Sequence, residues 1–326
     1  MPRPMRQASR TLCAALILGA LAPAPALAAG SDESAPSRRS ASVGPLTLEL
    51  RGGIEMNGRR YVLEGQRVVV EGRSARFAAG EGISFTISGP GRGSSEARAA
   101  LEPAGTGGRF RTEFTAQRTG VWTATAADSD GAQAVVAAHA VDPRVRRGSR
   151  GTGVRLMQRG LGNLGYVTPL GGRFDAATAR AVIAFRKVGG MARRPTAGRA
   201  VLAKLFRGEG GYALRHPGSG KHVEFDFSRQ VLVLARGGRV ERIYHAASGK
   251  RSTPTVFGTF SFYRKEPGTN RLGMVSSNYF IRGYAIHGYR SVPTRPASHG
   301  CIRVPIPNAV SISRWVALGD RIHVYR

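Results

Sequence analysis

The spacing of apolar residues changes twice along this 326-residue chain, and those changes constrain its fold more than any other feature. From Leu46 to about Val141, short runs such as LTLEL, RVVVEG, ISFTISG and RFRTEFTA alternate apolar with polar residues, with turn residues between them. A period of two is typical of half-buried strands, and seven or so such runs predict an antiparallel β-sandwich over residues 46–142. The segment has no cluster of catalytic residue types, so we interpret it as a spacer or packing module.

The next stretch has helical spacing. Val154, Met157 and Leu161 recur three and four residues apart, as on one face of a helix. Asp175 and Thr196 each precede a further apolar pattern and are residue types that cap helix N-termini. Three short helices predict a small bundle.

From His222 to the end of the chain the strand pattern returns, in HVEFDF, VLVLARGGRVERIYH, NYFIRGYAIHGY and DRIHVYR. The RGG tripeptide between two apolar runs predicts a hairpin. One helix is expected over residues 308–318. No glycine-rich loop joins a strand to a helix here, so a dinucleotide-binding fold is not predicted. The length accommodates two or three domains, and the whole pattern predicts a β-sandwich, a three-helix bundle and a mainly-β domain.

The N-terminus predicts export. Three arginines lie in the first ten residues, the apolar run LCAALILGAL follows, and an A-L-A tripeptide ends at Ala28. This is the pattern of a secretory signal peptide over residues 1–29, and the apolar run is too short for a membrane span. An uncleaved anchor is the alternative. The small polar residues of 30–45 are typical of a linker.

The net charge of +29 is unevenly distributed. Residues 30–142 carry 13 basic and 13 acidic side chains, residues 143–210 carry 15 and 2, and residues 211–326 carry 18 and 5. The basic C-terminal half predicts a polyanionic partner or surroundings. An exported protein meets anionic wall polymers or lipid headgroups before it meets nucleic acid, so nucleic acid is not the expected partner.

One stretch holds the residue types of a nucleophilic site. In YAIHGYRSVPTRPASHGCIRV, Cys301 is the only cysteine that remains after cleavage of the predicted signal peptide. A thiolate attacks carbonyl carbons, an imidazole can take the thiol proton, and amide N–H groups can stabilise the oxyanion. Either His287 or His299 could be the base, and the amides of Gly300 and Cys301 could converge on an oxyanion. The residues alone do not indicate which of the two histidines is the base.

Two other interpretations of these residues stay open. A lone cysteine can be buried and inert. Alternatively, His287, His299 and Cys301 are zinc-type ligands, although a fourth ligand is missing and the spacing matches no common structural zinc site.

The sequences HGYRSVPTRPASHGCIRV and SGKRSTPTVFGTF resemble the signature blocks of the L,D-transpeptidase (YkuD) catalytic domain, and the resemblance covers about residues 221–326. It implies that Cys301 is the nucleophile and His287 the proton acceptor, with no metal and no cofactor. It also implies supporting roles for nearby residues: orientation of the imidazole by the Gly288 carbonyl, shaping of the oxyanion nest by Ser298, His299 and Gly300, and substrate binding by Arg303 and Gly283.

Two weaker resemblances concern the rest of the chain. GSRGTGVRLMQRGLGNLGY with GGRFDAATARAVIAFRKVGG is similar to the peptidoglycan-binding domain type 1 family, over residues 147–208. FRTEFTAQRTGVWTATA resembles the late strands of immunoglobulin-like export domains. Together the resemblances imply an exported enzyme that cross-links peptidoglycan stem peptides with release of D-alanine. The alternatives are an L,D-carboxypeptidase on the same stems and a non-catalytic wall-binding protein.

Overall fold

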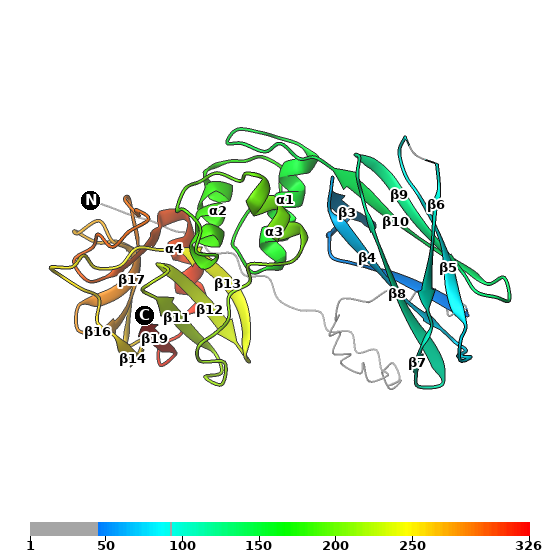
Figure 1. Ribbon diagram of the computed structural model, residues 1–326. Helices are drawn as coiled ribbons and strands as arrows, with labels where there is room; N and C mark the ends of the chain where they lie inside the picture. Colours follow the sequence, from blue (N-terminus) through cyan, green and yellow to red (C-terminus); the bar gives the residue numbers. More distant parts are fainter. Residues whose placement is uncertain (1–44, 92) are drawn as a thin grey trace, which may run out of the picture. The chain divides into compact units, whose positions relative to one another are not determined.

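The computed structural model describes residues 45–91 and 93–326. The expected signal peptide over 1–29, and all but the last residue of the expected linker over 30–45, lie outside the described residues. Along the described part, strands β1 to β10 come first, helices α1 to α3 follow, and a mainly-β region with one helix ends the chain (Figure 1). This order confirms the predicted multidomain fold class.

The N-terminal strands form two sheets with the spatial orders β1-β4-β8-β7 and β2-β3-β10-β9-β5-β6. Val68 and Phe110 from the first sheet pack in one core with Phe85 and Trp122 from the second, as expected for a sandwich. The bounds are β1 (Leu46–Arg51), β2 (Ile54–Met56), β3 (Arg59–Leu63), β4 (Arg67–Ser74), β5 (Gly82–Ser88), β6 (Ser95–Ala100), β7 (Glu102–Ala104), β8 (Gly107–Thr115), β9 (Gly120–Ala127) and β10 (Gln133–Val141).

Two details of these sheets differ from the sequence expectation. The described strands number ten rather than about seven, because three of them show no alternating apolar pattern. Strands β2 and β7 have only three residues each, and β6 (SEARAA) has no apolar residue larger than alanine. The pairing is also not wholly antiparallel, since β3 and β10 run parallel with Tyr61 opposite His139. Parallel pairing joins strands that are distant in sequence, and local patterns carry no information about it.

The helical region consists of α1 (Thr152–Asn163), α2 (Ala176–Val188) and α3 (Arg199–Phe206). The expected apolar stripe of α1 is buried at Val154, Met157 and Leu161. Asp175 caps α2 as predicted, because its Oδ1 accepts a hydrogen bond of 2.8 Å from the Thr178 amide. Among the described helices of the whole chain, none is both long and apolar enough to cross a bilayer.

The predicted cap at Thr196 is wrong. Helix α3 begins at Arg199, and its N-cap residue is Gly198, which has no capping side chain. Arg186 explains the shift, because its guanidinium donates to the carbonyls of Ala192 at 2.6 Å and Thr196 at 3.2 Å. These bonds hold the connection in a non-helical conformation up to Thr196, and the helix begins only afterwards.

The C-terminal region has two sheets, with the orders β13-β12-β11-β19-β14 and β15-β16-β17-β18. Phe225, Leu232 and Ile322 from the first sheet share one apolar core with Ile286 and Ile302 from the second. The predicted RGG hairpin joins β12 to β13 through two glycines with positive φ. The bounds are β11 (His222–Asp226), β12 (Val231–Arg236), β13 (Arg239–His245), β14 (Gly258–Ser261), β15 (Arg264–Thr269), β16 (Val275–Ile281), β17 (Tyr284–Tyr289), β18 (Ile302–Pro305), α4 (Ile306–Trp315) and β19 (Arg321–Tyr325).

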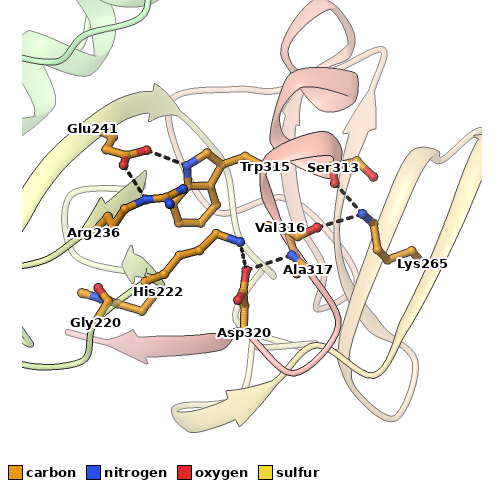
Figure 2. A network of polar contacts seen from close by, with 11 residues as sticks. Gly220, His222, Arg236, Glu241, Lys265, Ser313, Trp315, Val316, Ala317 and Asp320 are labelled. Carbon is orange, nitrogen blue, oxygen red and sulfur yellow. Dashed lines mark hydrogen bonds and ion pairs between the residues drawn. The ribbon is translucent and has the colours of Figure 1, made fainter. Parts of the chain in front are cut away.

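Helix α4 lies against β16 and β17 and lies two to three residues closer to the N-terminus than the expected range of 308–318. A polar network fixes its C-terminal end (Figure 2). Lys265 donates to the carbonyls of Ser313 and Val316, at 2.6 and 2.8 Å, which satisfies the acceptors that a helix end leaves unpaired. The Trp315 indole N–H donates to Glu241 at 2.6 Å. These contacts hold α4 behind the strands that carry the candidate site.

Candidate active site

His287 lies in β17, and Cys301 directly precedes β18, the neighbouring parallel strand. Strand β18 begins directly after Cys301 and pairs with β17, with Ile286 opposite Ile302 and His287 opposite Arg303. Because side chains alternate between the two faces of a sheet, this register places Cys301 beside Ala285 and on the same face as His287 and Arg303. The core packing agrees, since Cys301 packs against Ala285. Extended by one residue to Cys301, the register therefore places the thiol and the imidazole on one face, two positions apart along the strands.

The Cys301 thiol is partly buried and has a polar environment of its own. Its Sγ donates a weak hydrogen bond to the Gly283 carbonyl at 3.6 Å, in the turn between β16 and β17. Burial raises the pKa of the Cys301 thiol, while the backbone N–H of Ala285 and the charge of Arg303 act in the opposite direction. The raised pKa means that the resting thiol keeps its proton and needs a base.

His287 has the features of such a base. It is 3% exposed, and its Nδ1 lies 2.9 Å from the Gly288 carbonyl oxygen. A carbonyl only accepts, so Nδ1 carries the hydrogen and Nε2 is left with a lone pair. Burial lowers the pKa of His287, the Gly288 carbonyl opposes this, and Arg303 adds to it, so the ring is neutral at rest. Within the described residues no hydrogen bond joins His287 to Cys301.

The turn before Cys301 is organised around Ser298. Its buried hydroxyl accepts from the Gly300 amide at 3.1 Å and donates to the Cys301 carbonyl at 2.5 Å. Gly300 has φ +119°, and a Cβ there would lie 2.4 Å from the Tyr284 ring, so only glycine fits. Sequence reasoning expected the amides of Gly300 and Cys301 to converge on an oxyanion. In the structure the Gly300 amide is already bonded to Ser298.

The block SGKRSTPTVFGTF packs against this turn. Thr255 donates to the Gly300 carbonyl at 2.6 Å and accepts from the Gly249 amide at 2.9 Å. A Cβ on Gly249 would lie 2.9 Å from the Gly300 Cα, so the two backbones touch. Thr255 and Gly249 support the turn, and sequence reasoning assigned them no role. The signal was present, because they belong to the second block of the family resemblance.

His299 and Arg303 occupy different environments. His299 is exposed, and its Nε2 lies 3.5 Å from the Lys250 ammonium. The Arg303 guanidinium stacks 4.1 Å from the Tyr289 ring centre, and its Nε is buried without a hydrogen-bond partner. Arg303 thus brings a fixed positive charge next to both His287 and Cys301, and it lowers the pKa of each.

The metal interpretation gains no geometric support. Across residues 45–91 and 93–326, no three His, Cys, Asp or Glu side chains are grouped as metal ligands would be. His287, His299 and Cys301 therefore do not form a ligand set, although the sequence allowed one.

A family model and one solved structure indicate the same family. The model of the L,D-transpeptidase catalytic domain (YkuD) matches residues 220–324. The crystal structure of the L,D-transpeptidase (residues 123–326) from Xylanimonas cellulosilytica is 35% identical, with a TM-score of 0.52, over 57% of this chain and 98% of that one. The L,D-transpeptidase (Yku) from Stackebrandtia nassauensis is 19% identical, with a TM-score of 0.36, over 56% of this chain and 96% of that one. None of the curated proteins matches.

The family model covers the two sheets and the helix that hold Cys301 and His287. The similarity to the Xylanimonas cellulosilytica structure spans nearly all of that chain, and it reaches beyond the part of this chain that the family model matches. The N-terminal sheets and the three helices match no family model. On the identity and coverage of the first structure, this chain belongs to the L,D-transpeptidase (YkuD) family.

Proposed function

We propose that this protein is an exported peptidoglycan L,D-transpeptidase that uses Cys301 as its nucleophile. The donor is a tetrapeptide stem, and the bond that breaks joins the L-centre of its diamino acid to the terminal D-alanine. The family membership supports this reaction class. The observation that carries the assignment is the β17–β18 register, which brings Cys301 and His287 to one face of the sheet.

The first half-reaction is acylation. His287 Nε2 accepts the thiol proton as Sγ attacks the donor carbonyl, and a tetrahedral oxyanion forms. The oxyanion collapses, the bond to D-alanine breaks, and the imidazolium gives its proton to the leaving amine. A thioester on Cys301 remains. The Gly288 carbonyl orients the ring throughout, because it holds the Nδ1 hydrogen.

The second half-reaction transfers the acyl group. An amine of a neighbouring stem attacks the thioester, His287 takes a proton from that amine, and the thiol leaves with the proton returned. Water in place of the amine gives L,D-carboxypeptidase activity instead. Arg303 and Gly283 are assigned to substrate binding, and Arg303 offers a fixed cation to a substrate carboxylate.

The helical region and the N-terminus complete the proposal. Residues 147–208 would hold the enzyme on peptidoglycan or anionic wall polymers and raise the effective substrate concentration. The excess of 15 basic over 2 acidic side chains in residues 143–210 supports this role. Export rests on the signal-peptide pattern of residues 1–29.

The test is mass spectrometry of the protein incubated with a tetrapeptide muropeptide. We expect an acyl adduct on Cys301, released D-alanine, and cross-linked dimer when an acceptor stem is present. The Cys301→Ala variant, which removes only a sulfur atom, should stay folded and give neither adduct nor product. Dimer formation by that variant would refute the mechanism, and hydrolysed tripeptide without dimer would favour the carboxypeptidase.

A further inference from the structure

Lys187, in the last turn of α2, is buried without an acidic partner. It is 3% exposed, although lysine is rarely buried unless it is paired. Its Nζ donates to the carbonyls of Gln230 and Ala246, both at 2.8 Å, and lies 2.7 Å from His245 Nδ1. All three partners belong to the catalytic domain, whereas Lys187 belongs to the helical region. A helical residue is thus inserted into the framework of the catalytic domain.

The hydrogen-bonding roles around Lys187 are fully determined. His245 Nε2 lies 2.9 Å from the Val292 carbonyl, so Nε2 carries the hydrogen and Nδ1 accepts. Each of the three partners of Nζ is therefore an acceptor, which matches the three hydrogens of an ammonium group. Burial lowers the pKa of Lys187 to about 6, and the nearby charge of Arg193 adds to the shift. The three acceptors around Nζ favour the charged form. Removing Lys187 would leave His245 Nδ1 and the Ala246 carbonyl unpaired, whereas the Gln230 carbonyl would keep the Ala246 amide at 3.2 Å.

Two series of hydrogen bonds connect Lys187 to residues 290–301, the segment that ends at Cys301. The first passes through His245 to the Val292 carbonyl. In the second, the Gln230 side chain accepts from the Ser248 backbone amide at 2.8 Å and donates to the Ser248 hydroxyl at 2.8 Å. The Ser248 carbonyl then accepts from the amides of Ala297 and Ser298, at 2.8 and 2.9 Å. The second series ends at Ser298, whose hydroxyl donates a hydrogen bond to the Cys301 carbonyl.

A second helical-region residue holds the same segment directly. Arg193, just after α2, donates to the Thr294 carbonyl at 2.8 Å and to the Ser228 carbonyl at 2.7 Å. Residues 290–301 contain no helix or strand of their own, and Pro293 and Pro296 lack an N–H to donate. The conformation of this segment therefore depends on bonds from outside it, and the helical region supplies one of them directly, from Arg193 to the Thr294 carbonyl.

We propose that Lys187 is a positioning residue for Cys301, acting through His245 and the Gln230–Ser248 pair on residues 290–301. The helical region is then part of the catalytic scaffold as well as a binding module. The consequence for catalysis rests on the proposed function of Cys301, whereas the consequence for residues 290–301 does not.

The first test replaces Lys187 with methionine in the full-length protein, with Lys204→Met as the matched control. Lys204 is a half-exposed lysine of α3 whose ion pair with Glu209 spans 3.5 Å. We expect Lys187→Met to speed amide hydrogen exchange of Ala297 and Ser298 about 10-fold or more, and to lower the rate of Cys301 acylation at saturating donor. Lys204→Met should change neither.

The second test keeps the proposal falsifiable if Lys187→Met does not fold. Glutamine at His245 retains one acceptor for Lys187 and one donor for Val292, whereas leucine of similar size retains neither. We expect His245→Leu to loosen residues 290–301 and slow acylation, and His245→Gln to preserve both. Equal behaviour of the two variants, or loss of stability with unchanged exchange at Ala297 and Ser298, would reduce the cluster to a structural role. If stems are not substrates of the parent protein, the exchange measurement still decides the positioning role.

Discussion

Two buried histidines of the catalytic domain differ in what their rings can reach. His287 and His323 are 3% and 5% exposed, and burial lowers the pKa of both. His287 donates a hydrogen bond from Nδ1 to the Gly288 carbonyl. Among the described residues its Nε2 has no hydrogen-bond partner, and it is not fully buried. His323 bonds Thr259 through Nδ1, and its Nε2 is fully buried with no partner.

The surroundings of His323 explain the difference. Its ring stacks on His216 at 4.0 Å and meets the edge of His222 at 5.4 Å, and Glu224 is buried next to them. Neighbouring rings thus cover His323, whereas His287 lies opposite Arg303 of β18, two residues beyond Cys301. Burial and a shifted pKa are common to both residues, so they do not identify a catalytic base. The feature that supports His287 as the proposed base is an open Nε2 on the same sheet face as Cys301, the proposed nucleophile.

The largest expected effect comes from exchanging each ring for an amide. We expect His287→Gln to lower the rate of Cys301 acylation about 10²-fold or more, the usual cost of a lost general base. We expect His323→Gln to leave that rate within about 3-fold of the parent, because distant substitutions act on stability instead. The measurement is single-turnover acylation by a tetrapeptide stem or a carbapenem, at matched folded fraction.

His299→Ala is the control for the same experiment. Its exposed ring contacts Lys250, so we expect a smaller loss and a pH profile of thiol alkylation close to that of the parent. If His299→Ala lost the reactivity that His287→Gln retained, the base would be His299.

Local constraints explain which features could be predicted from the sequence, both in the candidate site and in the helical region. Gly300 needs a positive φ, and Asp175 needs only the amide three residues ahead, so short motifs record both. The engagement of the Gly300 amide by Ser298 depends on side-chain geometry, which the motif does not specify. Lys187 could not be predicted to be buried, because its acceptors lie 43 to 59 residues further along the chain. In sequence it is an ordinary basic residue at a helix end.

An intermediate effect should appear in the pH dependence of stability. Burial lowers the pKa of His323 to about 4, with the neighbouring His216 and His222 adding to it, while the unfolded chain titrates near 6.5. Between these values the unfolded state binds more protons, so the His323 contribution is complete above pH 6.5 and is lost as pH falls toward 4. We expect His323→Gln to reduce the loss of unfolding free energy between pH 7 and pH 5 by about 1–2 kcal/mol.

Urea denaturation of parent and variant at both pH values checks this. Burial also lowers the pKa of His245, to about 3, which has the same sign, so the variant should keep part of the slope. Identical slopes in the two proteins would show that His323 is protonated in the folded state as readily as in the unfolded one.

The smallest expected effect concerns binding rather than chemistry, and it separates the two roles given to the helical region. Arg155 and Arg159 are exposed on α1, whereas Lys187 is buried at the end of α2. We expect the double variant Arg155→Glu, Arg159→Glu to bind insoluble wall sacculi about 3- to 10-fold more weakly at low salt, with the difference shrinking as salt screens the charges. Its acylation by a small soluble stem should match the parent, because residues 290–301 keep their bonds to Lys187 and Arg193. The reverse pattern, with sacculus binding intact and soluble turnover lost, would assign the helical region to the catalytic scaffold alone.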